Sequence, residues 1–159
     1  MNRTAQVSIR PIGVSDKDRW RDLWRAYLAF YQTELPDAVY ETTFSRLLAG
    51  DAGIHGLIAE DGSEAGARAL GLVHYLFHPT CWKIEPVCYL QDLFTVPEAR
   101  GQGVARALIT AVYARADAAG APAVYWLTAE NNYRGRMLYD QVGVKSPFIK
   151  YNRAPINVA

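Results

Sequence analysis

Two glycines between an apolar run and an amphipathic run constrain this sequence more than any other feature. Residues 87–96 form a long apolar run that Pro97 ends, and residues 103–119 repeat apolar residues at helical spacing. Between them stands the stretch ARGQG, with Gly101 and Gly103. Small residues at such a junction expose the first N–H groups of the helix, which have no partner within it. The segment therefore predicts a strand–turn–helix unit whose turn is either a tight connection or an anion site.

Two arginines favour the anion site. A helix N-terminus carries roughly half a positive charge from the macrodipole, and Arg100 and Arg106 add full charges beside it. A diphosphate fits this description. Two other phosphate motifs do not match, because Arg106 occupies the last position of a Gly-x-Gly-x-x-Gly fingerprint and no Gly-Lys-Ser/Thr sequence is present.

The rest of the chain alternates between strand-like and helix-like patterns. Ser15 is a candidate N-cap for a helix whose aromatic residues recur at helical spacing up to Tyr31. The predicted elements are a strand at 7–10, helices at 15–35 and 39–49, strands at 54–60, 67–77 and 87–96, a helix at 103–119, a strand at 123–128, a helix at 132–141 and a strand at 148–151. This order predicts one α+β domain over residues 1–159 with a central mixed sheet, and it contains no internal repeat.

Composition narrows the possible functions. The chain has 159 residues and a formal net charge of +1, which argues against a nucleic-acid binder that relies on phosphate neutralisation. No apolar run approaches the roughly 20 residues of a transmembrane helix, and no secretory signal is evident. The only cysteines, Cys81 and Cys88, form no metal-site pattern, so we expect free thiols, a cytoplasmic protein and no metal.

Three sequence blocks resemble those of a known family. VPEARGQGVARALI is similar to the acetyl-CoA pyrophosphate loop of the GCN5-related N-acetyltransferase (GNAT) superfamily, with Arg100, Gly103 and Ala105 at the defining positions. YLQDLFTVP resembles its central strand, and YWLTAENNYRGRMLYDQVGV its second conserved block. LWRAYLAFY and RMLYDQVGVKSPFIKY look closest to the histone, polyamine and D-amino-acid acetyltransferase-like subgroup. The resemblance covers nearly the whole chain.

The resemblance implies a fold and a cosubstrate. The implied fold is a three-layer arrangement in which a mixed, mostly antiparallel sheet with splayed central strands is flanked by about four helices. Acetyl-CoA would lie in the splay, and its pantetheine arm would bond a strand edge much as a peptide does. The implied cofactor-binding residues are Leu93, Phe94, Thr95, Val96, Arg100, Gly101, Gln102, Gly103, Val104, Ala105, Arg106, Asn131, Asn132 and Arg134.

The implied reaction is direct attack of a primary amine on the thioester. Tyr139 matches the family's tyrosine and is the candidate general acid, since a phenol with an ordinary pKa near 10 keeps its proton at neutral pH. One of Asn131 and Asn132 is expected to cap the last helix, and the other, by the resemblance Asn132, is expected to hydrogen-bond the cofactor arm.

The general base is less clearly marked. Relatives often carry Glu before Asp in the central strand, whereas this chain has Gln91, which cannot accept a proton. Asp92 is then the candidate base, directly or through a water relay that Glu34 could also serve. Alternation along a strand places Gln91 and Asp92 on opposite faces of the sheet.

The acceptor amine is not specified by the sequence. Rings and carboxylates of the first helix pair suit an ammonium group, so Tyr27, Tyr31, Glu34 and Gln91 are candidate substrate residues, together with Asp37 and Tyr40. The same tyrosines at helical spacing are also what a buried core would show. The three histidines, His55, His74 and His78, are expected to be structural or exposed.

Two other functions use the same features. One is a catalytically silent acyl-CoA sensor or interaction module on this fold, and the other is a nucleotide-binding regulatory domain that binds ATP or NAD instead. For the enzyme we expect a small-molecule or peptide amine as partner, no nucleic acid, no membrane and, from the family, a homodimer.

Overall fold

The structure is a computed structural model that describes residues 7–62 and 67–154. Its contacts divide the chain into two compact units, residues 1–127 and 128–159, and each unit is described by itself. None of the helices within the described ranges has the length and apolar character needed to cross a membrane. The expectation of one domain over residues 1–159 stays a prediction.

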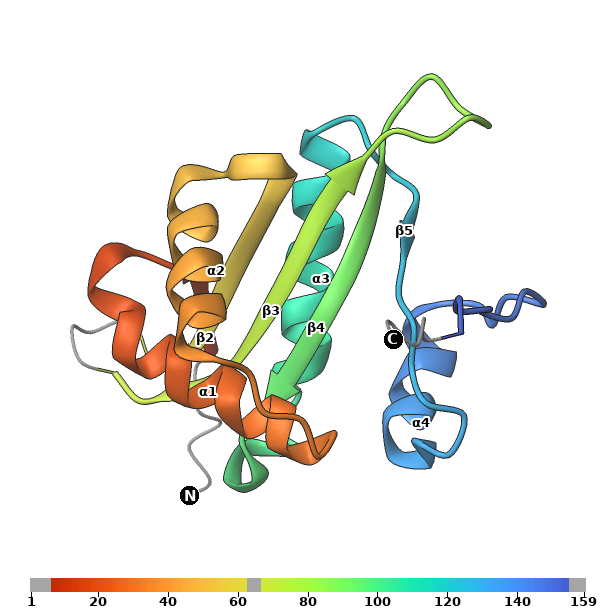
Figure 1. Ribbon diagram of the computed structural model, residues 1–159. Helices are drawn as coiled ribbons and strands as arrows, with labels where there is room; N and C mark the ends of the chain where they lie inside the picture. The colour runs from red at the N-terminus through yellow and green to blue at the C-terminus, as the bar shows by residue number, and fades with distance from the viewer. Residues whose placement is uncertain (1–6, 63–66, 155–159) are drawn as a thin grey trace. The chain divides into compact units, whose positions relative to one another are not determined.

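The first unit carries most of the secondary structure, coloured from red to cyan in Figure 1. Its strands are β1 (Val7–Pro11), β2 (Ile54–Asp61), β3 (Ala69–His78), β4 (Val87–Thr95) and β5 (Val124–Tyr125), and its helices are α1 (Lys17–Phe30), α2 (Asp37–Ala49) and α3 (Val104–Ala118). Short 3-10 turns lie at Val14–Asp16, Asp51–Gly53 and Pro97–Ala99. The second unit contains α4 (Tyr133–Val142).

The five strands form one sheet in the order β1-β2-β3-β4-β5. The first four pair antiparallel, whereas β5 runs parallel to β4, so the sheet is mixed and mostly antiparallel as expected. The parallel pair is short, because only Cys88 with Val124 and Tyr89 with Tyr125 are in register. From Leu90 onward β4 therefore continues without a β5 partner among the described residues, which is the splay that the family resemblance implies.

β4 contains a one-residue bulge at Gln91. His74 of β3 is opposite Asp92, but the next residue, Tyr75, is opposite Leu90. Gln91 is thus the extra residue on β4, and it is exposed. A bulge re-aims the side chains on either side of it, so Asp92 and Leu90 lie on opposite faces of the sheet.

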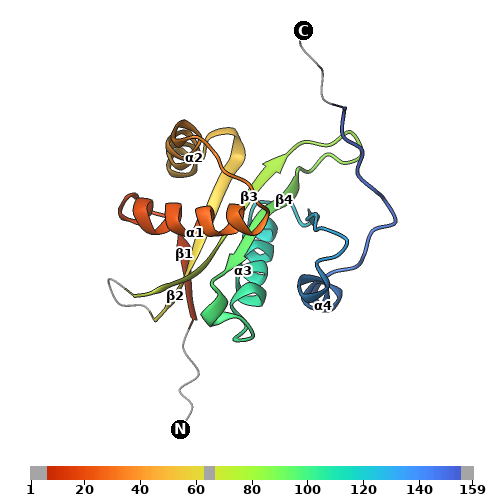
Figure 2. The ribbon, with the colours of Figure 1, turned by 60° about the horizontal axis from the view of Figure 1, so that its bottom comes forward.

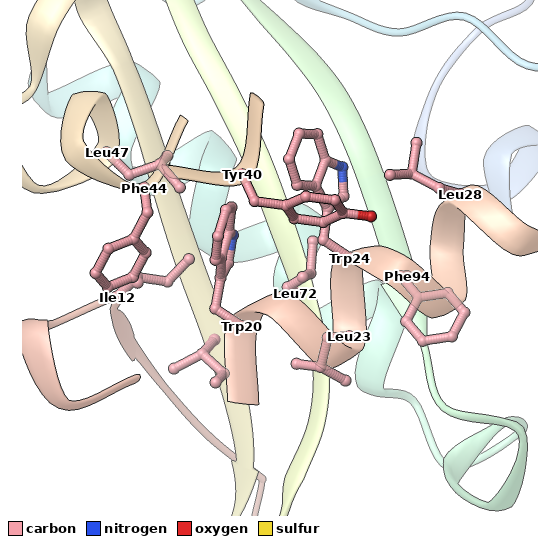
Figure 3. Close-up of a cluster of buried hydrophobic side chains, with 11 residues drawn as sticks. Ile12, Trp20, Leu23, Trp24, Leu28, Tyr40, Phe44, Leu47, Leu72 and Phe94 are labelled. Atoms are coloured by element: carbon pink, nitrogen blue, oxygen red, sulfur yellow. The ribbon is translucent and has the colours of Figure 1, made fainter. Parts of the chain in front are cut away.

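Helices cover the two faces of the sheet in separate layers. α1 and α2 lie on one face and α3 on the other (Figure 1, Figure 2). On the α1 and α2 face, the buried cluster is built around two tryptophans of α1 that lie one helical turn apart, Trp20 and Trp24 (Figure 3). Its members are Ile12, Trp20, Leu23, Trp24, Leu28, Tyr40, Phe44, Leu47, Ile58, Leu72 and Phe94.

Side chains of the α3 face are mostly aliphatic. Ile58 and Leu72 face α1 and α2. Because side chains alternate along a strand, Leu57 and Val73 lie on the other face of the sheet and point towards α3. Leu108 of α3 is fully buried, and its Cδ1 would lie 3.4 Å from a Cβ placed on Gly71. That same Cβ would lie 2.3 Å from the carbonyl oxygen of Phe94, so β3 and β4 approach too closely at Gly71 for any side chain there.

A buried ion cluster connects β1, β2 and the start of α1. Asp16 has no exposed surface, and it accepts hydrogen bonds from Arg10 at 2.6 and 2.8 Å and from the Gly13 N–H at 2.7 Å. Arg19 also bonds Asp16 and lies 3.0 Å from Glu60, which Arg10 contacts at 2.8 Å. The guanidinium groups hold the pKa of Asp16 well below its usual range, chiefly through the Arg10 hydrogen bond.

Three predictions about local structure were wrong. Ser15 lies inside the 3-10 turn that precedes α1, and the N-cap of α1 is Asp16. The strand expected at 123–128 is only two residues long, Val124–Tyr125. The strand expected at 148–151 is absent, since residues 147–154 of the described chain form no strand. Apolar alternation alone cannot form a strand without a neighbouring edge to pair with.

Candidate functional site

The N-terminus of α3 has the geometry of an anion site. Gly101 and Gly103 adopt left-handed φ angles of 79° and 83°, and Gly103 caps the helix without any side-chain hydrogen bond. The first hydrogen bond to the cap runs from the Ala107 N–H to the Gly103 oxygen at 2.9 Å. The N–H groups of the three residues before it, at positions 104–106, therefore have no acceptor within the helix.

Both glycines also open towards free space. A Cβ built on Gly101 or Gly103 would meet no atom within 4 Å, and residues 101–103 are exposed. Gly120, at the other end of α3, has a similar φ of 67° and equally open surroundings, so positive φ alone does not identify a site. The combination of open backbone with N–H groups that lack an acceptor within the helix does fit a diphosphate.

The polar side chains of this turn have different local partners. Arg100 is half-buried, and its Nε donates to the Thr95 oxygen at 3.3 Å. The Gln102 amide donates to the Glu98 oxygen at 2.8 Å. Arg106 is exposed on the first turn of α3, and Val104 is buried beneath it. Backbone groups, with Arg106 beside them, thus dominate the exposed surface of the turn.

The free edge of β4 leads towards this turn. The Val96 N–H donates to Leu70 of β3 at 2.9 Å, whereas the Thr95 oxygen faces the other way and accepts from Arg100. Because backbone groups alternate along a strand, Leu93 and Thr95 face the open edge and Phe94 faces β3. The Thr95 hydroxyl oxygen is buried without a hydrogen-bond partner among the described residues. Outward-facing backbone groups of a free strand edge can bond the amide groups of a ligand arm, as a peptide strand would.

A chain of buried hydrogen bonds crosses the sheet face beneath α1. Trp20 Nε1 donates to His74 Nε2 at 2.8 Å, and His74 Nδ1 lies 2.9 Å from Asp92 Oδ2. The Asp92 side chain remains 11% exposed. The other tryptophan of the pair, Trp24, has its Nε1 buried without a partner in the part of the chain that is described.

Asp92 was expected from the sequence, but Trp20 and His74 were not. His74 was predicted to be structural or exposed, and it is a buried residue that contacts a candidate base. The signal available in the sequence was weak. His74 is a single histidine in the apolar strand segment LVHYLF, and this segment gives no indication of which carboxylate the histidine contacts.

The residues expected to contact the acceptor divide into two groups. Tyr27 and Tyr31 lie together at the C-terminal end of α1, with ring centroids 5.1 Å apart, and Tyr27 also contacts Phe94 of β4 at 6.5 Å. Glu34 is exposed in the loop that follows. Tyr40, in contrast, is buried against both tryptophans and cannot contact an acceptor, and Asp37 pairs with Arg21.

A further aromatic group lies where β5 pairs with β4, and it was not predicted from the sequence. The rings of Tyr89 and Tyr125 stack with centroids 4.9 Å apart, and the Tyr125 hydroxyl lies 2.8 Å from His78 Nε2. Burial raises the pKa of both phenols. These three residues come from three strands, so their proximity depends on the sheet register and is not visible in local sequence.

The two cysteines are free, as expected, with Cys81 exposed and Cys88 buried. Burial raises the pKa of the Cys88 thiol to about 11, which makes it a poor nucleophile at neutral pH. No group of three or more His, Cys, Asp or Glu residues suited to a metal ion occurs within the described ranges.

The second unit carries the remaining predicted residues on or just before α4. Asn132, rather than Asn131, is the N-cap, because its Oδ1 accepts from the Gly135 N–H at 3.2 Å while its Nδ2 donates to Thr128 at 3.0 Å. Tyr139 is half-buried on the same helix, and Arg134 is exposed. Arg136 donates to the Glu130 oxygen at 2.6 Å.

Comparison with protein families places these features in context. The model of the acetyltransferase (GNAT) family matches residues 18–144, which span most of the chain and both units. The chain belongs to the GNAT family. It is accordingly an acetyl-CoA-dependent acyltransferase, with the splayed, mostly antiparallel sheet of that family.

A curated relative is considerably closer in sequence than the similar solved structures. The D-amino-acid N-acetyltransferase HPA3 of Saccharomyces cerevisiae (strain ATCC 204508 / S288c) is 40% identical over 148 residues, which cover 93% of this chain and 91% of the relative. This relative supports the predicted subgroup.

Solved structures share the fold at lower identity. The aminoglycoside N-acetyltransferase AAC(6')-Iy in complex with CoA has a TM-score of 0.80 at 20% identity, over 98% of this chain and 99% of that one. A ribosomal-protein-alanine N-acetyltransferase from Brucella melitensis biovar Abortus 2308 has a TM-score of 0.75 at 20% identity, over 93% and 98% of the two chains. At such identity these likenesses concern the fold alone.

Proposed function

We propose that this GNAT protein transfers the acetyl group of acetyl-CoA directly to the primary amine of a small molecule, and that D-amino acids are the first acceptors to test. One observation carries the proposal. The free edge of β4, where backbone groups of Leu93 and Thr95 face outward, runs into an open, glycine-lined helix N-terminus. That arrangement suits a ligand with a polar arm and a diphosphate, which is the chemistry of coenzyme A.

Each residue set has a distinct task in this proposal. The backbone of residues 101–106, with Arg100 and Arg106, holds the diphosphate, and the backbone of Leu93 and Thr95 orients the arm. Asn132 and Arg134 are assigned to coenzyme A by the family resemblance alone. Acetyl-CoA, when bound, supplies an activated thioester whose C–S bond breaks as the new N–C bond forms.

Proton transfers accompany this exchange. The attacking amine must be neutral, so Asp92 accepts a proton from the ammonium form, directly or through one water molecule. After the attack the nitrogen carries one proton more than the amide product and releases it to solvent. The departing thiolate receives the phenolic proton of Tyr139, which solvent then restores. Glu34, exposed beyond the end of α1, is the alternative base.

The acceptor class follows from the relative and from the surface around the site. HPA3 is named for D-amino acids, at 40% identity over nearly the whole of both chains. Tyr31 is 43% exposed at the end of α1, and Tyr125 is 39% exposed beside β4. Exposed rings at these two positions suit the side chain of an apolar or aromatic amino acid better than a polycation.

A thiol-release assay with acetyl-CoA and an amine panel tests the activity. The panel contains D- and L-amino acids, a polyamine, an aminoglycoside and a lysine peptide. We expect turnover with D-amino acids and little with their L-enantiomers. Tight CoA binding without turnover of any amine would favour the silent sensor, and binding of ATP or NAD without CoA would favour the nucleotide-binding domain.

Tyr139→Phe tests the general acid. Removing a proton donor to the leaving group typically lowers kcat by about 10²–10⁴-fold, while CoA affinity stays the same. Tyr133→Phe is the matched control, since Tyr133 lies on the same helix and is 71% exposed. Equal kcat values for the two variants would remove Tyr139 from the mechanism.

The pH–rate profiles of Asp92→Asn and Glu34→Gln test the base. We expect the acidic limb of kcat to move in Asp92→Asn only. Unchanged profiles in both variants would leave the amine to lose its proton in solution. The homodimer and the cytoplasmic location stay predictions, which size-exclusion chromatography and cell fractionation would test.

A further inference from the structure

We infer that Trp20 and His74 are positioning residues for Asp92. Trp20 keeps the His74 ring neutral, and the neutral ring donates a hydrogen bond to Asp92, so that the carboxylate stays available as the base. We call this arrangement the lock. This inference rests on the proposed function, because it concerns the residue assigned there to the proton transfer. It adds two residues of α1 and β3 that no sequence motif identifies. The lock is a buried relay from an indole to an imidazole to a carboxylate.

The direction of each hydrogen bond follows from the first one. An indole N–H can only donate, so His74 Nε2, 2.8 Å from Trp20 Nε1, must be the accepting nitrogen without a proton. A neutral imidazole then carries its proton on Nδ1, which donates to Asp92 Oδ2 at 2.9 Å. A second proton on the ring would sit on Nε2, so that two N–H donors, those of Trp20 and His74, would face each other. The relay therefore keeps His74 neutral.

Asp92 by itself would favour a charged imidazolium, whereas the other groups around His74 add no charge that would do so. On α1 the rings of Trp20 and Trp24 lie 6.1 and 5.4 Å from the imidazole, and neither is charged. Register places Gly56 of β2 beside it, which adds no charged side chain. On β4 the facing charge is Asp92 itself. Arg21 and Arg25 lie over the outer Tyr40 ring, at 4.7 and 5.8 Å from its centroid.

The lock matters because a carboxylate beside an imidazolium is a weaker base. If His74 took up a proton, the ion pair would stabilise the charged carboxylate and lower its tendency to accept a proton from the amine. A neutral donor fixes one oxygen of Asp92 with a smaller effect on its basicity. The exposed 11% of the side chain leaves the carboxylate accessible to water.

The two tryptophans supply a matched pair of variants. Trp20→Phe removes the N–H that blocks His74 Nε2, whereas Trp24→Phe removes an N–H that has no partner in the described chain. Both rings are buried on the same helix, so the packing change is similar. In Trp20→Phe nothing keeps His74 Nε2 without a proton, so the ring can form an ion pair with Asp92. We therefore expect kcat of Trp20→Phe to be about tenfold lower than that of Trp24→Phe.

Two substitutions of His74 separate positioning from mere packing. Asparagine can keep the donor to Asp92 but not the acceptor for Trp20, and glutamine can keep the acceptor for Trp20 but not the donor. Each variant loses one buried hydrogen bond, so their losses of stability should be similar. We expect kcat of His74→Asn within about threefold of the wild type and kcat of His74→Gln about tenfold lower or more. Equal kcat losses in the two variants would overturn the positioning role.

Histidine NMR tests the lock without using activity. The chain has three histidines, and the resonance that disappears in His74→Asn identifies this one. We expect ring nitrogen shifts of the neutral Nδ1–H tautomer for His74 in the wild type and in Trp24→Phe, and loss of that single form in Trp20→Phe. An Nε2–H tautomer or an imidazolium in the wild type, or identical ring nitrogen spectra for the two tryptophan variants, would overturn the inference. Failure to acetylate any amine would instead overturn the proposed function and leave the NMR result standing.

Discussion

On one face of the sheet, α3 packs Leu108 and Val112 against aliphatic side chains of the strands, and these residues are fully buried. On the other face, α1 packs Trp20 and Trp24 around His74 and Asp92. The same strands supply both faces, because Val73 alternates with His74 and Leu93 with Asp92. One sheet thus separates an aliphatic interior from an interior that contains ionisable groups.

The difference concerns what each face contributes. Aliphatic burial stabilises by roughly 25 cal/mol per Å² of apolar surface removed from water and needs no particular partner. Buried charges seldom add net stability over apolar residues of the same shape, yet breaking one partnership is costly. Asp92 and His74 are therefore poorly explained as stabilising residues, and their place beside the free edge of β4 fits a chemical role.

The largest effect on stability is expected at the buried ion cluster of Asp16, which lies on the α1 side of the sheet. Asp16→Asn leaves Arg10 and Arg19 facing a neutral amide in a buried position, so we expect unfolding free energy to fall by about 3–5 kcal/mol in urea denaturation. Asp37→Asn is the control, because Asp37 pairs with Arg21 while its own side chain is 85% exposed. That control should cost about 0–1 kcal/mol. Similar losses in both would show that burial of Asp16 is unimportant.

The ion cluster also predicts a direction of pH dependence. The pKa of Asp16 is lowered in the folded protein, chiefly by its hydrogen bond to Arg10, while the unfolded carboxyl titrates near its ordinary value of 3.8. A lowered pKa gives stability that is fully present above the unfolded value and is lost as the pH falls through the folded one. We expect wild-type stability to decline below about pH 4 and the decline to be smaller in Asp16→Asn.

A cavity in the aliphatic face should affect stability but not chemistry. Leu108→Ala removes a fully buried side chain beneath β3, and we expect a loss of about 3 kcal/mol in unfolding free energy. kcat at a temperature where the variant is folded should be unchanged. Leu48→Ala, at a position that is 40% exposed on α2, should cost far less. A large fall in kcat for Leu108→Ala would mean that the two faces are coupled.

Most of the fold could be predicted because its strongest signals are local. The glycines of the α3 turn, the tryptophan spacing of α1 and the apolar run of β4 each specify a segment without any knowledge of its neighbours. Predictions failed where a segment depends on a partner. β5 is a strand only where β4 pairs with it, and residues 148–151 have no strand pairing in the described chain.

The candidate site divides in the same way. Backbone features at the α3 turn follow from residue types that are adjacent in sequence. The Trp20–His74–Asp92 relay joins residues whose sequence separations are 54 and 18 positions, and a one-residue bulge at Gln91 decides that Asp92 meets His74. Asp92 was a candidate because it is the titratable residue next to Gln91, but only the register of β3 and β4 identifies its partner.

The smallest effect on stability is expected for the two glycines at the ends of α3, and these two ends are expected to differ in CoA binding. Gly103→Ala and Gly120→Ala each place a Cβ at a left-handed φ, 83° and 67°, with open space around it. Both should therefore lose about 1 kcal/mol of stability from backbone strain. Only Gly103 lies at the end of the helix whose first N–H groups lack an acceptor within it, so only Gly103→Ala should weaken CoA binding, by about tenfold in isothermal titration calorimetry. Equal affinities would mean that Gly103 serves the turn alone and that the diphosphate lies elsewhere.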